Sequence, residues 1–378
     1  MPRLSFSFPV STNSLFYAHY NIIAYRPEMQ YAQINPISYL FIANPNHHSD
    51  RNPVNNPKLR SQRSVDYEIG FRQKIGENAS LSIAAYYSEK KDLIQAYRFT
   101  GAYPNTYFSY ENQDFGTVQG YTLGLAMRGA KNLTFRANYT LQFAKGTGSS
   151  AESNIAIIAS GQPNLRTLTN LDFDQRHNIS GMIDFRFGQG TDYNGPVTRK
   201  QKKGTETVRE IRWLENTGVT LLASGRSGMP YSRSGIVYSA LQWGERTKGQ
   251  LLGDINGANM PWTFQCDLRL DKSFLLNLAS KKDKPEGGTR KNKPGTLNIY
   301  LEFQNLFNIK NVINVYDYTG NASDDGYLSS QLFTNQMARG TAFGMPINSA
   351  INYYEMAIAN PFNFTQPFRV HLGIVFSF

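Results

Sequence analysis

The sequence contains a single cysteine, Cys266, and no hydrophobic run approaches the roughly 18 apolar residues that a transmembrane helix requires. One cysteine can neither form an internal disulfide nor build a cysteine-based zinc site by itself. Glycine-rich nucleotide loops are also missing, because the only Gly-Gly pair, Gly287-Gly288, lies in a basic segment with no helical pattern after it. These absences argue against disulfide-stapled domains, helical membrane proteins and phosphate-binding loops.

Acidic residues are fewer than basic ones, and the formal net charge is +11. Most of the excess lies in two short segments, Arg199–Lys203 and Lys281–Lys293, which have glycine, proline or polar neighbours and no interleaved aromatic residues. Nucleic-acid-binding surfaces usually combine positive charge with stacking side chains. We therefore interpret both segments as solvated turns and expect no nucleic-acid partner.

The clearest positive signal is the alternation of side chains at the carboxy terminus. Successive residues of a strand face opposite sides, and a tilted strand that crosses a bilayer needs about 9 to 11 residues. Arg369, His371 and Ser377 are among the residues that would occupy one face of a strand from Phe368 to Phe378. The other face would carry only apolar side chains: Phe368, Val370, Leu372, Ile374, Phe376 and Phe378.

Similar alternating segments recur along the chain, separated by connections that are in turn short and long. Between Leu133 and Ala144 the alternation is the most regular. Charged residues such as Glu302 fall on the polar side of their segment, where charge costs least in a barrel with an aqueous or plugged lumen. The expected strands are Arg3–Val10, Leu15–Ala24, Ser64–Ile75, Ser80–Tyr97, Tyr107–Arg128, Leu133–Ala144, His177–Phe187, Gly218–Tyr231, Phe264–Phe274, Thr296–Phe307 and Phe368–Phe378.

We conclude that the fold class is all-β, an antiparallel transmembrane β-barrel with about eleven strands. Single-chain bacterial barrels have an even number of strands, with short periplasmic turns and longer outer loops. With the carboxy terminus in the periplasm, the tight turns and both basic segments fall on the periplasmic side, and the first strand starts from outside. No signal-peptide pattern precedes that strand. We therefore expect residues 1–378 to be the carboxy-terminal half of a larger barrel.

No constellation of residues predicts catalysis or a metal site. His47-His48 and Asp50 could offer metal ligands, but adjacent residues of an extended chain point apart. Asp174 and His177 could form an acid-base pair, yet no nucleophile or second carboxylate accompanies them. We predict no catalytic residue, no metal and no cofactor.

Aromatic and amide residues are frequent in the long outer connections. Such side chains can stack on a sugar or peptide and hydrogen-bond to it, although an interfacial aromatic girdle or packing of one loop on another would use the same residues. The candidates for substrate contact are Tyr103, Tyr107, Tyr110, Asn112, Tyr316 and Tyr353.

Four short stretches and the terminal phenylalanine resemble one known family, the TonB-dependent outer-membrane receptors. The resemblance is to the large forms with an amino-terminal carboxypeptidase-regulatory-like domain. The stretches appear in the order expected for that family and, with Phe378, span most of the chain. They are Asn56-Pro57-Lys58-Leu59 with Arg63–Gly70 after it, Asp174-Gln175-Arg176-His177, Gly228-Met229-Pro230-Tyr231-Ser232 and Asn305–Asn311.

This resemblance implies a 22-stranded barrel that encloses a plug domain and lies in the cell outer membrane. Residues 1–378 would supply eleven of those strands, and the plug and the amino-terminal half would be absent from them. The implied partners are outer-membrane lipid, the barrel-assembly machinery, TonB acting through the missing plug domain, and a small-molecule, glycan or peptide ligand. Phe376 and Phe378 would form the assembly signal.

The function expected from the sequence is therefore part of a receptor for active nutrient uptake, not an enzyme. A passive or secretion-related outer-membrane barrel without TonB coupling is the alternative, and an upstream plug and TonB box would decide against it. A surface enzyme is a third class, weakened by the lack of a convergent nucleophile and base.

Overall fold

The computed structural model describes residues 1–32, 53–101, 106–159, 161–164, 166–201, 208–237, 251–277, 294–338, 341–342 and 344–378. One 12-stranded sheet dominates it, in which eleven strands follow one another in sequence order and β7 pairs with β6 beside that path. All the pairings of this sheet are antiparallel. Its strands are β1 (Arg3–Ser11), β2 (Ser14–Tyr25), β3 (Gln62–Ile75), β4 (Ala79–Phe99), β5 (Tyr107–Ala130), β6 (Leu133–Gly146), β7 (Thr169–Asn170), β8 (His177–Arg186), β11 (Thr217–Arg226), β14 (Thr263–Asn277), β15 (Pro294–Gln304) and β18 (Arg369–Ser377).

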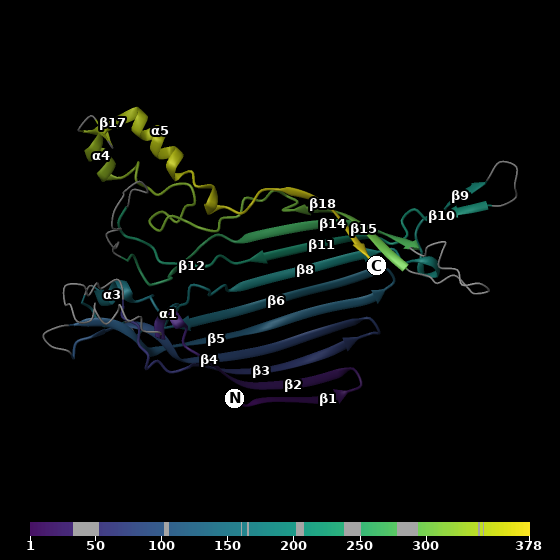
Figure 1. The fold of residues 1–378 in the computed structure, drawn as a ribbon, viewed down its shortest axis with the longest axis horizontal. Helices are drawn as coiled ribbons and strands as arrows, with labels where there is room; N and C mark the ends of the chain where they lie inside the picture. The colour runs from purple at the N-terminus through teal and green to yellow at the C-terminus, as the bar shows by residue number, and fades with distance from the viewer. Residues whose placement is uncertain are drawn as a thin grey trace, which may run out of the picture.

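The sheet has a tight-turn end and an outer end (Figure 1). At the tight-turn end, β1 and β2 are joined through Thr12 and Asn13, and β5 and β6 through Lys131 and Asn132. The carboxy terminus lies at this end, while β1 starts toward the other one (Figure 1). The carboxy terminus and the tight turns therefore share one end of the sheet, as the alternating lengths of the connections predicted.

The strands β4 and β5 are longer than a membrane crossing requires. They have 21 and 24 residues, against the about 9 to 11 that a tilted strand needs to cross a bilayer. Their register is interrupted near Asp92, which has a φ of 55° and lies where the regular pairing of Lys90 with Gly116 shifts. The two strands therefore extend past the outer end of their neighbours and carry part of the outer loops.

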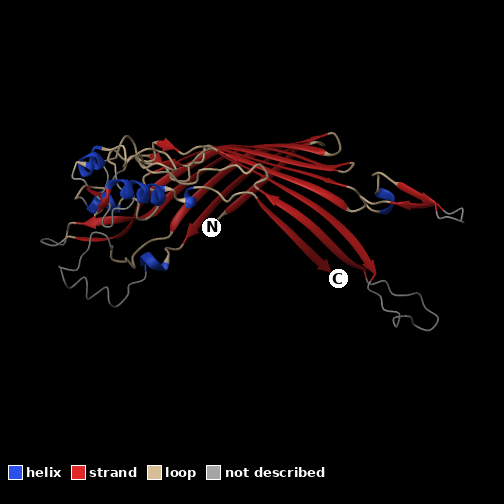
Figure 2. Cartoon of the chain, turned by 90° about the horizontal axis from the view of Figure 1, so that it is seen from above, coloured by secondary structure: helices blue, strands red, loops and turns tan. Residues whose placement is uncertain are grey.

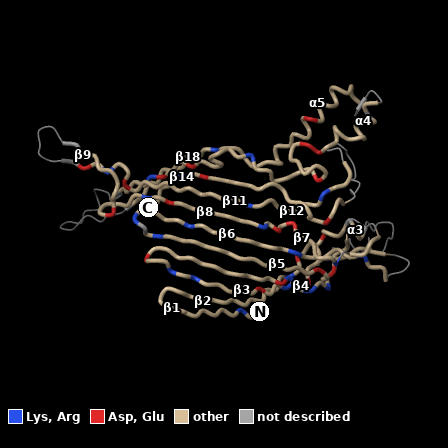
Figure 3. The backbone as a smooth tube through the Cα atoms, turned by 180° about the vertical axis from the view of Figure 1, so that it is seen from behind, with Lys and Arg blue, Asp and Glu red and all other residues tan. Residues whose placement is uncertain are grey.

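The two faces of the sheet differ in the way that the sequence predicted. Residues paired across strands share a face, so Leu301 lies beside Leu270 and Leu372, whereas Glu302 lies beside Arg269 and His371. We call these the apolar face and the polar face. Charged residues are more frequent near the strand ends and in the loops than along the middle of the strands (Figure 3).

One predicted strand is wrong in its extent. Gly218–Tyr231 was expected to be continuous, but β11 ends at Arg226 and the chain resumes as β12 (Pro230–Tyr231), which pairs with β13 (Ala258–Asn259) in a separate small sheet. The break follows from Gly228, where a Cβ atom would overlap the backbone of Met260. The Gly228–Ser232 stretch is thus a crossing point between two segments and not a continuation of the strand.

Only residues 199–201 of the first basic segment lie within the described ranges, and they belong to a strand rather than to the solvated turn that we expected. That strand, β9 (Thr198–Gln201), pairs with β10 (Val208–Ile211) in a hairpin. Arg199 forms an ion pair with Glu210 at 3.4 Å. This hairpin projects beyond the tight-turn end, beside the 3-10 helix η2 (Gly190–Asp192) (Figure 1). The second basic segment, Lys281–Lys293, lies outside the described residues.

Short helices occur in the outer connections, which the all-β prediction did not include. Figure 2 shows most of them gathered at one end of a curved sheet. None of the helices in the described ranges is long and apolar enough to cross a membrane. The elements are α1 (Met29–Ala32), α3 (Ile155–Ala159), α4 (Gln331–Met337), α5 (Ile347–Ile358) and the 3-10 helix η4 (Pro361–Asn363), with a small sheet of β16 (Thr341–Ala342) and β17 (Met345–Pro346).

The outer loop between β15 and β18 has its own core. Ala350, Tyr354 and Ile358 recur at intervals of four along α5, so they lie on one helix face, and all three are buried. Tyr327 and Phe333 pack against them. This core makes part of the loop a compact unit that lies beyond the outer end of the sheet (Figure 1).

Candidate functional site

The candidates around the β4–β5 connection lie in packed or bonded positions. Tyr107 is half-buried and stacks on Phe99, with ring centroids 4.9 Å apart and planes 8° from parallel. Tyr110 is only 4% exposed and packs on Tyr31. Its hydroxyl donates a hydrogen bond to Glu152 at 3.3 Å. Tyr103 lies outside the described residues.

Asn112 ties a loop segment to β4 through its amide. Its Nδ2 donates to the carbonyl oxygens of Arg60 and Asp92, at 2.9 Å and 2.7 Å, and its Oδ1 accepts from the Arg60 backbone N–H at 2.7 Å. Three hydrogen bonds leave this amide little capacity to bind anything else. For Asn112 the geometry therefore favours a role in packing of the outer connections over ligand contact.

The candidates in the last outer loop have unequal exposure. The Tyr316 hydroxyl donates to the carbonyl oxygen of Ile358 at 3.0 Å. Burial, helped by the negative charge of Asp325, raises the pKa of Tyr316. Tyr353, in contrast, is 52% exposed and lies about 100° around α5 from the buried Tyr354. Among the candidates in the described residues, Tyr353 is therefore the one most accessible to a ligand from outside.

The structure also forms a cavity that the sequence did not predict. It has a volume of about 420 Å³ and lies where the outer ends of β14, β15 and β18 meet the last loop. Gln304 pairs with Arg369 on the polar face, and Gln265 lies on the same face two residues before Asp267. Phe362 and Phe364 contribute aromatic rings from the loop. We call this the polar cavity.

Amide, guanidinium and aromatic groups converge in the polar cavity. Such groups can hydrogen-bond to and stack on a polar ligand, and Arg369 can also pair with a carboxylate. Phe362 is 83% exposed, so its ring is open to contact. Alternation alone would have placed Gln304 and Arg369 on one face, but finding the cavity required the fold of the loop that closes it.

Stretches that resemble the receptor family are built into the backbone scaffold. Asn305 donates from Nδ2 to the carbonyl oxygens of Ile309 and Gln366, each at 3.0 Å, and thereby ties the end of β15 to the start of β18. Asn311 exchanges hydrogen bonds with both the N–H and the carbonyl of Phe264. Both residues line the polar cavity, and their hydrogen bonds to the backbone fix its position.

The Asp174–His177 stretch likewise has bonded side chains. Asp174 accepts a hydrogen bond from the Ala144 N–H at 2.8 Å and pairs with Arg176 at 3.0 Å. The His177 ring lies 2.9 Å from the Tyr139 hydroxyl and stacks on Trp262. Within the described ranges, no group of three or more potential metal ligands occurs. His47, His48 and Asp50 lie outside those ranges.

Nearer the tight-turn end, the polar face carries an ion pair that spans a strand. Arg186 on β8 reaches across Gly218 of β11 to Asp271 on β14, with two N–H···O contacts of 2.8 Å. Asn298 on β15 adds a hydrogen bond to Asp271 at 3.1 Å. Four neighbouring strands are thereby coupled on the polar face.

The proposed assembly signal is accessible. Phe376 is 46% exposed and Phe378 is 96% exposed, and their ring centroids are 5.8 Å apart on the last strand. Within the described residues, β18 pairs with β15 alone and β1 pairs with β2 alone. Both ends of the sheet therefore offer unpaired backbone groups to a further strand.

Comparison with known proteins finds one matching family and several similar solved structures. The family described as "TonB dependent receptor-like, beta-barrel" matches residues 1–225. Comparison with curated proteins finds no match. The chain spans about a third of the length of the solved structures it resembles.

Three solved structures illustrate the likeness. The ferripyoverdine receptor of the outer membrane of Pseudomonas aeruginosa is 11% identical, with a TM-score of 0.45, over 84% of this chain and 30% of the other. The FrpB iron transporter of Neisseria meningitidis is 13% identical, with a TM-score of 0.45, over 82% and 35%. The outer membrane transporter YddB of Escherichia coli is 13% identical, with a TM-score of 0.43, over 80% and 36%.

The family match covers more than half of the chain, and the matched residues include strands of the sheet that the sequence predicted. Family members are outer-membrane receptors and transporters, not enzymes, so the apolar face is the lipid-facing side and the polar face is the luminal side. The chain belongs to the TonB-dependent receptor family, as a portion of its outer-membrane β-barrel.

Proposed function

We propose that this chain forms part of a receptor that imports a polar ligand actively across the outer membrane, coupled to TonB through a plug domain. The polar cavity is the observation that carries the proposal. It lies on the luminal face at the outer end, where a ligand arriving from outside meets the barrel wall. Gln304 and Arg369 would bind the ligand, and the exposed Phe362 would stack on it.

The chemistry of the cavity favours a ligand with several hydrogen-bonding groups. Its amides can both donate and accept, while Arg369 favours a carboxylate or another anionic group. An oligosaccharide, a peptide and a metal chelate with acidic groups all satisfy this description. Tyr353, exposed on α5, remains a candidate for an earlier contact on the outer surface, and Tyr107, Tyr110, Asn112 and Tyr316 would then support the loops.

Uptake by whole cells tests this proposal. Cells that produce the full-length protein would be given labelled oligosaccharides, peptides and ferric chelates, with and without an intact TonB system. We expect accumulation of one ligand class to require TonB and to fall at least about tenfold in a Gln304→Ala/Arg369→Ala double variant, as the loss of two ligand contacts of about 1 kcal/mol or more predicts. Arg136→Ala, also on the luminal face but far along the sheet on β6, is the control and should transport normally.

A passive or secretion-related barrel is the second candidate function. It predicts the same accumulation or conductance with and without TonB, and no dependence on Arg369. TonB-independent entry of the ligand would decide for this alternative and against active uptake.

We further propose that residues 1–378 are the carboxy-terminal half of a 22-stranded barrel. The unpaired backbone of β1 and β18 and the eleven consecutive strands of the sheet support this arrangement. The resemblance of four stretches to the large receptor forms supports a carboxypeptidase-regulatory-like domain in the same protein. Sequencing the gene upstream of Met1 tests both ideas, and a signal peptide directly before Met1 would contradict them.

A further inference from the structure

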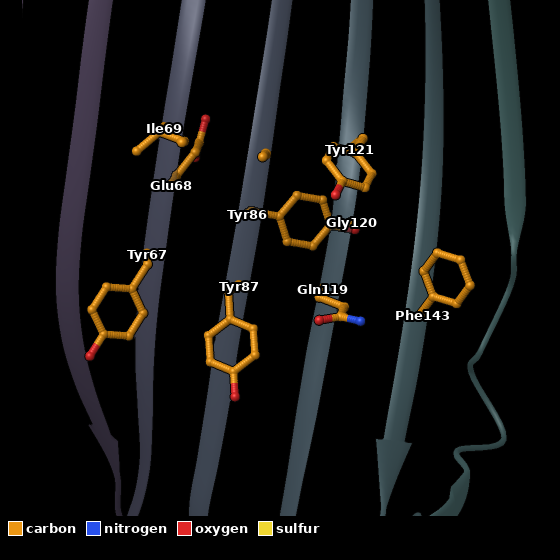
Figure 4. A pocket seen from close by; sticks show the side chains of 10 residues that line it. Tyr67, Glu68, Ile69, Tyr86, Tyr87, Gln119, Gly120, Tyr121 and Phe143 are labelled. Atoms are coloured by element: carbon orange, nitrogen blue, oxygen red, sulfur yellow. The ribbon is translucent and has the colours of Figure 1, made fainter.

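A second cavity lies on the lipid-facing side of the sheet, where no nutrient ligand would pass. It has a volume of about 450 Å³ and extends over β3, β4, β5 and β6 (Figure 4). Tyr67, Tyr87, Tyr121 and Phe143 form its walls, and Ala85 lies between them. We call it the lipid-side cavity.

Strand register assigns this cavity to the lipid-facing side. Tyr67, Tyr87, Gln119 and Phe143 are paired in one row across four strands. Tyr121 pairs with Ala85 in the next row on the same face. Residues of the other face, such as Glu68 and Tyr86, touch the cavity only from the intervening positions of β3 and β4. The lining side chains therefore point toward the membrane.

The row lies in the outer half of the bilayer. From Tyr67 to the end of β3 at Ile75 there are eight residue steps (75 − 67), and on β4 there are also eight from Ala79 to Tyr87 (87 − 79). At about 3.4 Å per residue and a strand tilt of about 40°, eight steps rise about 20 Å above the tight turns. The apolar band of such barrels is about 25 Å tall, so the row is near its outer edge.

Unpaired polar groups at this depth point to a specific occupant. Gln119 is exposed, and no hydrogen bond links its amide to any part of the chain that the structure describes. The same holds, within those ranges, for the hydroxyls of Tyr67 and Tyr87, which are 45% and 39% exposed. An amide left unpaired against hydrocarbon costs several kcal/mol, so a hydrogen-bonding partner within the apolar band would stabilise Gln119.

We propose that the lipid-side cavity binds an outer-leaflet lipid that carries an amide-linked acyl chain. The chain lies over Ala85 between Tyr121 and Phe143, and its amide linkage pairs with Gln119 in both directions, N–H to carbonyl and carbonyl to N–H. An ester linkage could only accept hydrogen bonds and would leave the Gln119 carbonyl unpaired. The occupant is a membrane lipid because the cavity is continuous with the lipid-facing surface, and the inference does not depend on which nutrient the receptor imports.

Native mass spectrometry of the full-length protein tests this site. The protein would be purified from outer membranes in a mild detergent and titrated with rough lipopolysaccharide, whose lipid anchor has amide-linked chains, or with dioleoylphosphatidylethanolamine, which has only ester-linked chains. We expect one lipopolysaccharide to stay bound to the wild type, and about fivefold weaker retention in Gln119→Leu, as for the loss of one hydrogen bond. Phosphatidylethanolamine should be retained no better by wild type than by Gln119→Leu.

Filling the cavity provides the matched comparison. Ala85→Phe should abolish retention of the lipid, whereas Ala137→Phe, an alanine of the same face on β6 outside the cavity, should not change it. Heat-resistant migration of each folded barrel shows that the variants are assembled. Equal retention in Ala85→Phe and Ala137→Phe, or retention of phosphatidylethanolamine equal to that of lipopolysaccharide in the wild type, would overturn the proposal. Unchanged retention in a folded Gln119→Leu protein would also overturn it.

Discussion

The two faces of one sheet solve different problems with alternate residues of the same strands. On the lipid-facing side, neighbouring side chains such as Tyr20 and Tyr67 form rows of rings, with centroids 5.2 Å apart. On the luminal side, Arg186 crosses Gly218 to reach Asp271. On the lipid-facing side, contact between apolar side chains and lipid stabilises the sheet. On the luminal side, specific hydrogen bonds and ion pairs between strands stabilise it. Adding a charge should therefore destabilise the barrel most on the lipid-facing side, whereas removing a charge should destabilise it on the luminal side.

Glycine and tyrosine are paired on the luminal side in a repeated way. The Tyr17, Tyr86 and Tyr300 rings lie over Gly70, Gly120 and Gly373, which are their direct partners in register on the next strand. A Cβ atom on any of these glycines would overlap the tyrosine ring. Each missing side chain thus provides the space in which a large neighbouring ring lies flat against the wall.

Moving charge from one face to the other should have the largest effect. Leu301→Arg or Leu372→Arg places a guanidinium in lipid and should destabilise the barrel by about 2 to 4 kcal/mol near the midplane. Gln304→Arg, on the luminal side of the same strand as Leu301, is the control and should cost far less. Denaturant titration of the full-length protein, followed by loss of the heat-resistant folded form, measures both. Equal losses at Leu301 and Gln304 would show that the faces are assigned wrongly.

Removing the charge of Asp271 should have an intermediate effect. The Asp271 side chain is 5% exposed and accepts two bonds from Arg186, so Asp271→Asn should cost about 1 to 3 kcal/mol. Asp184→Asn is the comparison, because Asp184 lies farther from Arg186, at 3.6 Å. Urea midpoints of the two variants should differ, with Asp271→Asn lower. The same midpoint for both would mean that the luminal network does not couple the strands.

Adding a methyl group to a paired glycine should have the smallest effect of the three. Gly373→Ala pushes the Tyr300 ring away from its position beneath Arg269, whose guanidinium lies 4.0 Å from the ring centroid, and should cost about 1 kcal/mol. Gly181 on the lipid-facing side has only one atom near an added Cβ, at 3.9 Å. Gly181→Ala should therefore be neutral or slightly stabilising. A larger loss at Gly181 than at Gly373 would contradict the pairing of ring and glycine.

The strands were predictable because their alternation is a local property of the sequence. The expected Leu133–Ala144 is observed as Leu133–Gly146, and the expected Phe368–Phe378 as Arg369–Ser377. For the expected strand Gly218–Tyr231, a contact distant in sequence decided the outcome. Gly228 must pass the backbone of Met260, and that close approach ends β11 before Tyr231.

The site was less predictable than the strands because it depends on how long loops fold. The spacing of Ala350, Tyr354 and Ile358 carried a helical signal that alternation elsewhere in the chain obscured. Exposure could not be inferred from residue type, since Tyr353 and Tyr354 are neighbours with opposite surroundings. Likewise, the polar cavity needs Gln304 and Phe362 brought together from β15 and a distant loop residue.

Cross-linking of the two edge strands tests the central claim that this sheet is part of a larger barrel. Phe6 on β1 and Ile374 on β18 would be replaced by cysteines in the full-length protein, with Cys266 changed to alanine, and oxidised in outer membranes. Ile299 and Ile374, which are paired in register, provide the positive control. We predict efficient cross-linking of the control pair and none between residues 6 and 374, because other strands lie between β1 and β18. Efficient cross-linking of residues 6 and 374 would mean that the barrel closes within this chain and would contradict the account.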